Sequence, residues 1–379
     1  MAGGAVRIDG TTLHLPGGVQ VRFKRTLRLP ETGTHQLPPG LGDFPIRRVE
    51  DYPHTAPEQM RTRGGVMLPV YLREAMWLHF GGTKEPAALQ VGVGKVCAVS
   101  GKPWSSTLTR KPQNYVVLPR QPWLDGINSG KGTVRQFVAV PLGLGATVEG
   151  QVTGEEVFGG VQLQSFPLND KQLAGWREQE RLRTERERNM GPVGGYGGPV
   201  PAAPMPPPTY GAPMPPAPAG DPMPPGAAMP MSAPGSAPMG GAPAARTRAP
   251  AAMGLGVGGS MRQEVYKDDW PSGSWAEQPA GRIFVHLVTP PEWRRITGEA
   301  PPPSPVDRAA YTKAGLPWFE YYSADEGAAH DVDPADTLGA VKPVGDWLGT
   351  DFDPWQAPTP GQVKPLGDAP GRPIQDGDW

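Results

Sequence analysis

Five side chains in the first half of the chain form the strongest candidate for a binding site. Trp123 and Asp125 stand just before a glycine, Lys131 lies between two glycines, and Arg135 and Glu149 follow in strand-like segments. If these segments pair, the side chains would converge at one end of a sheet and form a polar pocket with an aromatic wall. In a second interpretation, Asp125 belongs to a turn and Arg135 pairs with Glu149 across two strands.

Other motifs that resemble known chemistry each lack a required part. The segment 126–132 resembles a phosphate-binding loop, but it is one residue short between glycines and ends in Gly132 instead of a hydroxyl residue. The glycines of 254–259 fit a dinucleotide-binding pattern, yet they follow no predicted strand and open no predicted helix, so we interpret them as linker glycines. The six histidines lack zinc-site spacing, and 331–336 lacks the glycine and glutamate of a calcium loop. We therefore expect no cofactor and no metal, and we assign no catalytic residue.

The elements that must position these side chains are mostly strands. From Leu13 to Leu29 apolar and polar residues alternate around Pro16, Gly17 and Gly18, which predicts a hairpin with one buried face and one basic face. Further strands are expected at 75–80, 89–99, 115–118, 133–140, 147–152, 161–166 and 282–288. Short strands at this spacing favour an α+β, mainly β fold with an antiparallel sandwich or barrel-like body and few helices.

Two helices are predicted beside these strands. The longer one covers about 170–188, with Asn169 as its N-cap and a second half that consists almost entirely of charged residues. The shorter one covers about 291–297. The strand at 282–288 has apolar residues on both faces, which is typical of a strand in the middle of a sheet.

A tract rich in proline, glycine, alanine and methionine separates the two halves of the chain. Between Gly191 and Gly259, 34 of 69 residues are Gly or Pro and three are charged. Such a composition buries too little apolar surface to offset the entropy cost of ordering the backbone, so we expect a long disordered insertion. The expected division is a β body at 1–168, a charged helix at 169–190, the linker at 191–259, a part at 260–322 that packs on the body, and a loose, acidic, mostly irregular tail at 323–379.

Charge and cysteine content limit the classes of protein. Residues 1–190 hold 24 Lys and Arg against 17 Asp and Glu, whereas residues from Ser323 onward hold three against 11. The single cysteine, Cys97, excludes an intramolecular disulfide and suits a reducing compartment. No apolar run approaches the length of a membrane span, and no secretory signal opens the chain. We therefore expect a cytoplasmic protein.

Several motifs are shared with one group of proteins. They are PWLDG at 122–126, VRQFVAVPLG at 134–143, TVEGQVTG at 147–154 and GLPWFEYY at 315–322. With these motifs, the chain resembles an uncharacterised bacterial protein family. The resemblance implies one folded unit made from both flanks of the tract, and it implies no activity.

The sequence favours a non-enzymatic role in protein interaction or assembly. Polyproline segments of the tract suit aromatic grooves, and Asp346 to Trp355 alternates acids with aromatic residues, so a protein partner is expected through the tract or the tail. One alternative is an enzyme or small-ligand binder that uses the pocket around Trp123. The second is weak nucleic-acid binding through the basic face of residues 14–28, which the mild net charge and the few aromatic residues disfavour. That face consists of His14, Gln20, Arg22, Lys24 and Arg28.

Overall fold

The chain begins with three consecutive antiparallel strands. The structure is a computed structural model that describes residues 5–189, 252–305, 307–321, 332–349 and 355–366. The predicted hairpin consists of β2 (Thr12–Leu15) and β3 (Val19–Thr26), and β1 (Arg7–Asp9) pairs with β2. Leu13, Val19, Val21 and Phe23 are fully buried, whereas the alternating polar residues His14, Gln20 and Arg22 are half-buried. The period of two in the sequence therefore marks the core face of this hairpin.

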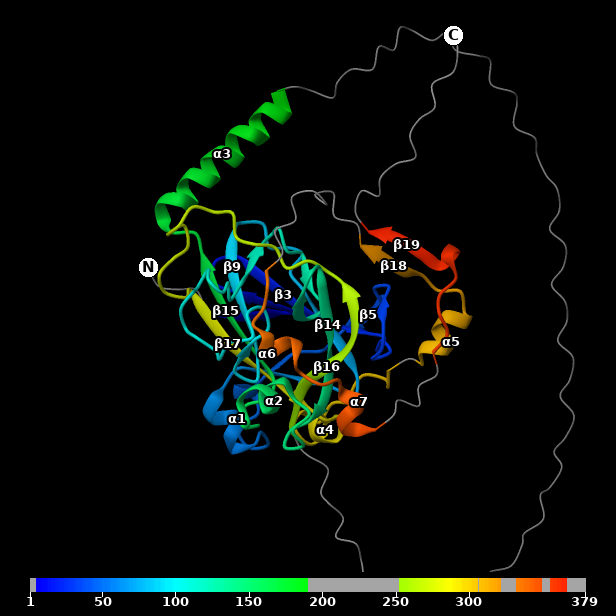
Figure 1. The fold of residues 1–379 in the computed structure, drawn as a ribbon. Coiled ribbons are helices and arrows are strands. Elements are labelled where there is room, and N and C mark those ends of the chain that lie inside the picture. The colour runs from blue at the N-terminus through cyan, green and yellow to red at the C-terminus, as the bar shows by residue number, and fades with distance from the viewer. Residues whose placement is uncertain (1–4, 190–251, 306, 322–331, 350–354, 367–379) are drawn as a thin grey trace, which may run out of the picture. The chain divides into compact units, whose positions relative to one another are not determined.

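β3 belongs to the first of two arms of the main sheet (Figure 1). It pairs with β8 (Ala75–His79), which pairs with β14 (Thr133–Pro141), which in turn pairs with β16 (Ala252–Arg262), always antiparallel. Shorter strands extend this arm. They are β5 (Gly40–Asp43) on β3, β12 (Trp123–Leu124) on β8, β13 (Gly126–Gly130) on β14, and β4 (Thr34–His35), which is parallel to β16.

The second arm is centred on β15 (Val161–Pro167). One neighbour is β9 (Ala87–Val93), which also pairs with β10 (Val96–Cys97) and β11 (Val116–Leu118). The other neighbour is β17 (Gly281–Val288), whose far side runs parallel to β7 (Val66–Pro69), and β6 (Arg47–Arg48) pairs with β7. β17 therefore has strands on both sides, as its two apolar faces predict. The segment expected to be one strand over 89–99 turns back at Gly94 and Lys95, both of which have positive φ.

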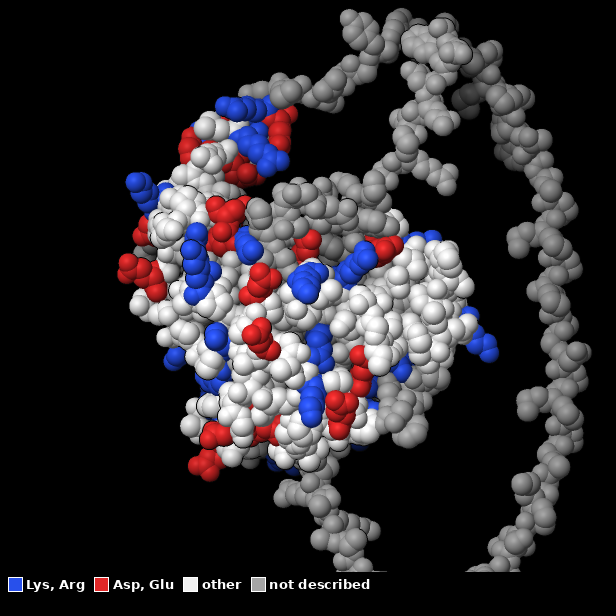
Figure 2. All heavy atoms as spheres, in the orientation of Figure 1, with Lys and Arg blue, Asp and Glu red and all other residues white. Residues whose placement is uncertain are grey.

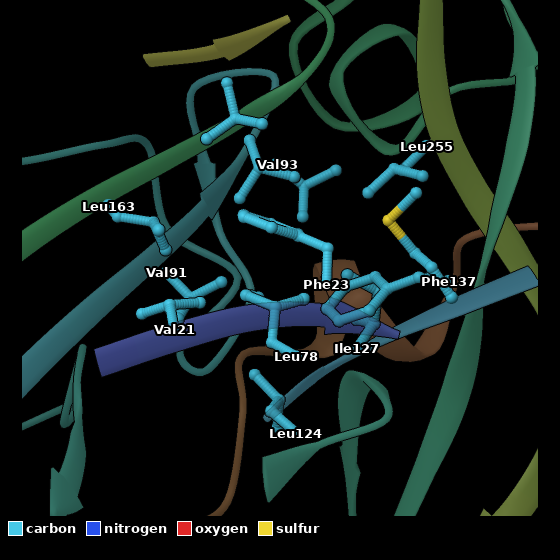
Figure 3. Packing of buried hydrophobic residues seen from close by; sticks show 14 of the residues in the cluster. Val21, Phe23, Leu78, Val91, Val93, Leu124, Ile127, Phe137, Leu163 and Leu255 are labelled. Carbon is cyan, nitrogen blue, oxygen red and sulfur yellow. The ribbon is translucent and has the colours of Figure 1, made fainter. Parts of the chain in front are cut away.

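One hydrophobic core takes side chains from both arms. The arms meet where Ala252 and Met253 of β16 pair with Val288 and Leu287 of β17. Figure 3 shows the packed side chains, which come from β3, β8, β14 and β16 of the first arm and from β9 and β15 of the second. They include Val21, Phe23, Leu78, Phe137, Leu255, Val91, Val93 and Leu163, all at most 1 % exposed. The predicted class, a mainly β body with an antiparallel sheet and few helices, is confirmed.

The glycines of 254–259 are part of a buried strand, so their interpretation as linker is wrong. Residues 252–262 form β16, which lies beside β14 along nearly its whole length. A Cβ at Gly256 would lie 2.8 Å from the carbonyl oxygen of Ala146 and 2.9 Å from Val344, so this strand needs glycine for close approach of its neighbours. Residues 190–251 of the tract, and with them the predicted disordered insertion, lie outside the described residues.

The strand predicted at 147–152 is also wrong. Val148–Thr153 form helix α2, and the side-chain oxygen of Thr147 accepts a hydrogen bond from the backbone N–H of Gly150 at its N-terminus. Gly154 ends the helix in the left-handed conformation. A capping threonine and a terminating glycine are helix signals that outweigh the short alternation of apolar residues between them.

Both predicted helices are present. α3 (Asp170–Asn189) begins where the side chain of Asn169 accepts the N–H of Gln172 at 2.9 Å, and α4 (Pro290–Thr297) buries Trp293 and Ile296. The described residues divide into two units within α3, and residues 179–189 at its end belong to the second unit. None of the described helices is both long and apolar enough to span a membrane.

The remaining elements are short. Among the described parts of the tail, Leu338 and Val344 are fully buried. The other helices and strands are α1 (Glu58–Arg63), α5 (Arg308–Lys313), α6 (Asp336–Gly339), α7 (Val344–Leu348), the parallel pair β18 (Trp318–Tyr321) and β19 (Val363–Leu366), and 3₁₀ turns at Val49–Asp51 and Pro360–Gln362.

Candidate functional site

Of the five residues of the predicted pocket, Trp123 and Asp125 are in contact, and the other three have different neighbours. The indole N–H of Trp123 donates to the carboxylate of Asp125 at 2.8 Å, so these two lie together. Lys131 is exposed at the turn between β13 and β14, with a φ of 55°. Arg135 on β14 donates to the carbonyl oxygen of Val341. Glu149 lies on α2 rather than on a strand, and its carboxylate accepts backbone N–H groups instead of pairing with Arg135.

Asp125 is a buried acid in this group. Its carboxylate accepts the indole N–H of Trp123, and its backbone N–H donates to the side-chain oxygen of Gln263, the residue after β16, at 2.9 Å. Burial raises the pKa of Asp125 to about 7, although the hydrogen bond from Trp123 acts in the opposite direction. Above neutral pH the carboxyl group ionises while buried, which destabilises the folded state.

A different pocket lies on the second arm, and we call it the cationic pocket. It has a volume of about 570 Å³ and is open to solvent on the face formed by β9, β15 and β17. Its charged lining residues are Arg63, Lys95 and Arg282, and no Asp or Glu is among the described residues that line it. Its aromatic lining residues are Trp104, Phe158 and Phe284, and its floor includes Gln162 and Gln164.

Strand register explains how these residues meet. Gly92 of β9 is opposite Gln162 of β15, which is opposite Phe284 of β17. Two residues further along β15, Gln164 lies opposite Gln90 of β9 and Arg282 of β17. Directly opposite residues in neighbouring strands share one face of a sheet, so a floor of glutamines lies between Phe284 and the loop that carries Trp104.

Trp104 covers the β9 side of the pocket. Its backbone N–H donates to the carbonyl oxygen of Lys95 at 2.8 Å, which holds the loop against the turn between β9 and β10. A Cβ at Gly92 would lie 2.5 Å from Cε3 of Trp104, so the absence of a side chain at Gly92 gives the indole its seat. Gln162 accepts the N–H of Lys95 at 2.9 Å, which ties the same turn to the floor.

The three cations share one electrostatic environment. Burial lowers the pKa of Lys95, and the positive charges of Arg282 and Arg63 lower it further, while Glu149 raises it. The guanidinium of Arg63 and the ammonium of Lys95 lie 4.7 Å and 5.0 Å from the ring centre of Phe158. A bound anion would relieve the mutual repulsion of these cations, so the pocket suits a negatively charged ligand.

Glu149 positions one wall of the cationic pocket from behind. Its carboxylate accepts the N–H groups of Phe158 at 3.1 Å and Gly159 at 2.8 Å. Burial raises the pKa of Glu149, against the effect of these backbone hydrogen bonds. Arg63 donates to the carbonyl oxygens of Val157 and Phe158 at 2.9 and 3.2 Å. The 157–159 loop is thus fixed by an acid on one side and a cation on the other.

Replacing Glu149 by alanine should release this loop. We expect a loss of about 1 to 3 kcal/mol in the free energy of unfolding, because two backbone N–H groups lose their acceptor. The measurement is urea unfolding followed by circular dichroism. The matched control is Glu155→Ala, since Glu155 is exposed in the loop after α2, and its effect should stay within about 0.5 kcal/mol. Equal effects of the two changes would contradict the positioning role of Glu149.

The basic face of residues 14–28 is largely engaged within the protein. Lys24 forms an ion pair with Asp43, and Arg22 is hydrogen-bonded to His79 at 3.0 Å. Arg28 is 8 % exposed and lies 3.8 Å from Glu31. On the face of the molecule in Figure 2, basic and acidic side chains are interspersed, with no broad area of one sign. These contacts give little support to the second alternative, a nucleic-acid-binding surface on this face.

The residues of the cationic pocket were missed because they are far apart in sequence. Arg63 ends α1, Lys95 lies in a turn, and Arg282 begins β17, so no spacing rule connects them. One local signal existed: Gln162 and Gln164 alternate within an otherwise apolar strand, which indicates a polar sheet face. Among the described residues, no group of three or more His, Cys, Asp and Glu side chains is placed to hold a metal ion.

Comparison of the chain with protein-family models, with curated proteins and with solved structures gives no match. The resemblance to an uncharacterised bacterial family therefore stays a prediction.

Proposed function

We propose that the protein is a non-enzymatic binding protein that takes an anionic ligand into the cationic pocket. The observation that supports this is the convergence of Arg63, Lys95 and Arg282 on an open pocket of about 570 Å³. Pockets of this size are typical of small-molecule sites. The sequence also predicts a small-ligand binder as an alternative, with its pocket around Trp123. The pocket proposed here lies on the second arm instead.

The side chains on the pocket wall suit recognition. Guanidinium and ammonium groups donate hydrogen bonds to phosphate or carboxylate oxygens, and the aromatic rings supply apolar contact. Burial lowers the pKa of the half-buried Lys95, and Arg282 and Arg63 lower it further, so an anion nearby would stabilise its charged form. Binding is therefore expected to raise the pKa of Lys95 and to weaken as salt increases.

Arg282→Ala tests the proposal. Arg282 is exposed at the rim, so its removal should leave the fold intact while it weakens binding of inorganic pyrophosphate about tenfold, since one charge-assisted hydrogen bond contributes roughly 1.5 kcal/mol. Isothermal titration calorimetry at low salt measures the affinity. The matched control is Arg294→Ala on α4, which is exposed and lies outside the pocket lining. Equal affinity in both variants, or no binding by the wild type, would contradict the proposal.

A role in protein interaction or assembly is a second proposal that rests on the sequence. Its main support is the Pro-rich tract, which connects α3 to β16 and whose residues 190–251 lie outside the described part. A cytoplasmic location is likewise proposed, because a single cysteine suits a reducing compartment.

A further inference from the structure

We infer that the ligand of the cationic pocket is a free mononucleotide, with its base between Trp104 and Phe284 and its phosphate on the cations. This inference rests on the proposed function, since it names the class of anion. It comes from the arrangement of aromatic, amide and cationic groups within one pocket.

Trp104 and Phe284 lie on opposite sides of β15, on a line that crosses the sheet perpendicular to its strands. Trp104 lies over Gly92 of β9, and Phe284 belongs to β17, two strands away. Neighbouring strands are about 4.8 Å apart, so the two backbones are roughly 10 Å apart with the floor residue Gln162 between them. The pocket contacts both rings and Gln162, which provides space for one planar group above the floor.

The cationic groups surround this planar space. The carbonyl oxygen of Lys95 accepts the backbone N–H of Trp104, and the ammonium of Lys95 lies 5.0 Å from the ring centre of Phe158. Arg63 lies 5.5 Å from the ring centre of Phe284, and Arg282 is two residues before Phe284 on the same face of β17. Cations thus lie beside the rings of Phe158 and Phe284, and the backbone of Lys95 adjoins Trp104. This arrangement matches a molecule with a planar apolar part joined to a strongly anionic part.

The size of the pocket favours a free nucleotide over a strand of nucleic acid. A volume of about 570 Å³ accommodates one nucleotide, and single-stranded binding normally needs an extended basic groove with several stacking platforms. Inorganic phosphate or a sugar phosphate would bind the cations but would not stack on Trp104 or Phe284. Stacking on the rings is therefore what should distinguish a nucleotide from other anions.

The experiment compares ligands that share the phosphate. By calorimetry at low salt, we expect the tightest of the four ribonucleoside 5′-monophosphates to bind at least tenfold more tightly than ribose 5-phosphate, roughly the contribution of one stacked base. Trp104→Leu, which keeps an apolar cover over Gly92, should remove this advantage, because it should weaken nucleotide binding about tenfold more than it weakens ribose 5-phosphate binding. Trp347→Leu is the matched control, because Trp347 is 43 % exposed and lines a different pocket.

The outcomes separate the inference from the proposed function. Equal binding of nucleotides and ribose 5-phosphate would overturn the mononucleotide assignment while anion binding stands. Binding of neither these compounds nor pyrophosphate would overturn both. If a single-stranded decanucleotide binds more tightly than any mononucleotide when affinity is expressed per nucleotide, the ligand is nucleic acid and the mononucleotide assignment is overturned. Loss of the advantage in Phe284→Leu as well would support it independently of Trp104.

Discussion

Gly259→Ala is expected to destabilise the β body strongly. A Cβ at this position would lie 2.0 Å from the carbonyl oxygen of Pro30 and 2.9 Å from the Cβ of Leu29. Both obstacles belong to the body itself, and Leu29 is fully buried, so neither can move aside without displacing core residues. β16 and the segment at Leu29 and Pro30 would have to move apart, although β16 is paired with β14 from Thr133 to Pro141.

The expected loss is more than about 3 kcal/mol in the free energy of unfolding, beyond ordinary overpacking, because backbone rather than a flexible side chain is in the way. Urea unfolding followed by tryptophan fluorescence measures it. The matched control is Gly175→Ala in α3, where a Cβ meets nothing within 4 Å. That change should stabilise the protein by up to about 1 kcal/mol, because alanine is the better helix former. A Gly259→Ala protein as stable as wild type would show that β16 is not packed as described.

Asp125→Asn is expected to stabilise the protein above neutral pH. Burial raises the pKa of Asp125 to about 7, well above its ordinary value of 3.8, so the folded state binds this proton more tightly than the unfolded state does. The stabilisation from this proton is complete below about pH 4, falls as the pH rises, and is lost once the pH passes about 7. Over that range the group should lower the free energy of unfolding by up to about 4 kcal/mol.

Asparagine keeps an oxygen for the indole of Trp123 and cannot ionise. Asp125→Asn should therefore be more stable than the wild type at pH 8, with a difference that shrinks towards pH 4. Urea unfolding at a series of pH values measures both curves. Asp51→Asn is the control, since Asp51 is exposed and its curve should run parallel to that of the wild type. Parallel curves for Asp125→Asn and wild type would mean that Asp125 is not the buried acid described here.

The two corrected elements show where sequence patterns failed. Residues 254–259 continue the composition of the Pro-rich tract, and only contacts with Val138, Ala146 and Pro30 explain why these glycines belong to a strand. Residues 147–152 alternate like a strand, yet Thr147 and Gly154 cap a helix. In the first case the deciding information was non-local, whereas in the second it was local and was outweighed by periodicity.

The sequence by itself determined the class of this protein and most of its elements. Alternation with a period of two located β3, β8, β14, β15 and β17. Successive side chains of a strand point to opposite faces of the sheet, so the two faces lie in different environments. Asn169 located the start of α3, because a cap acts within one turn of its helix.

Only the tertiary structure decided where the functional groups lie. The residues of the predicted pocket do not converge, because Glu149 lies on a helix and binds the 157–159 loop, and Arg135 donates to the carbonyl oxygen of Val341. The cationic pocket formed instead from α1, a turn after β9, and β17. These meet through the pairing of β9 and β17 with β15, which joins residues almost 200 positions apart in the chain. Strand pairing over such separations is set by the burial of a shared core, and no local spacing of residues records it.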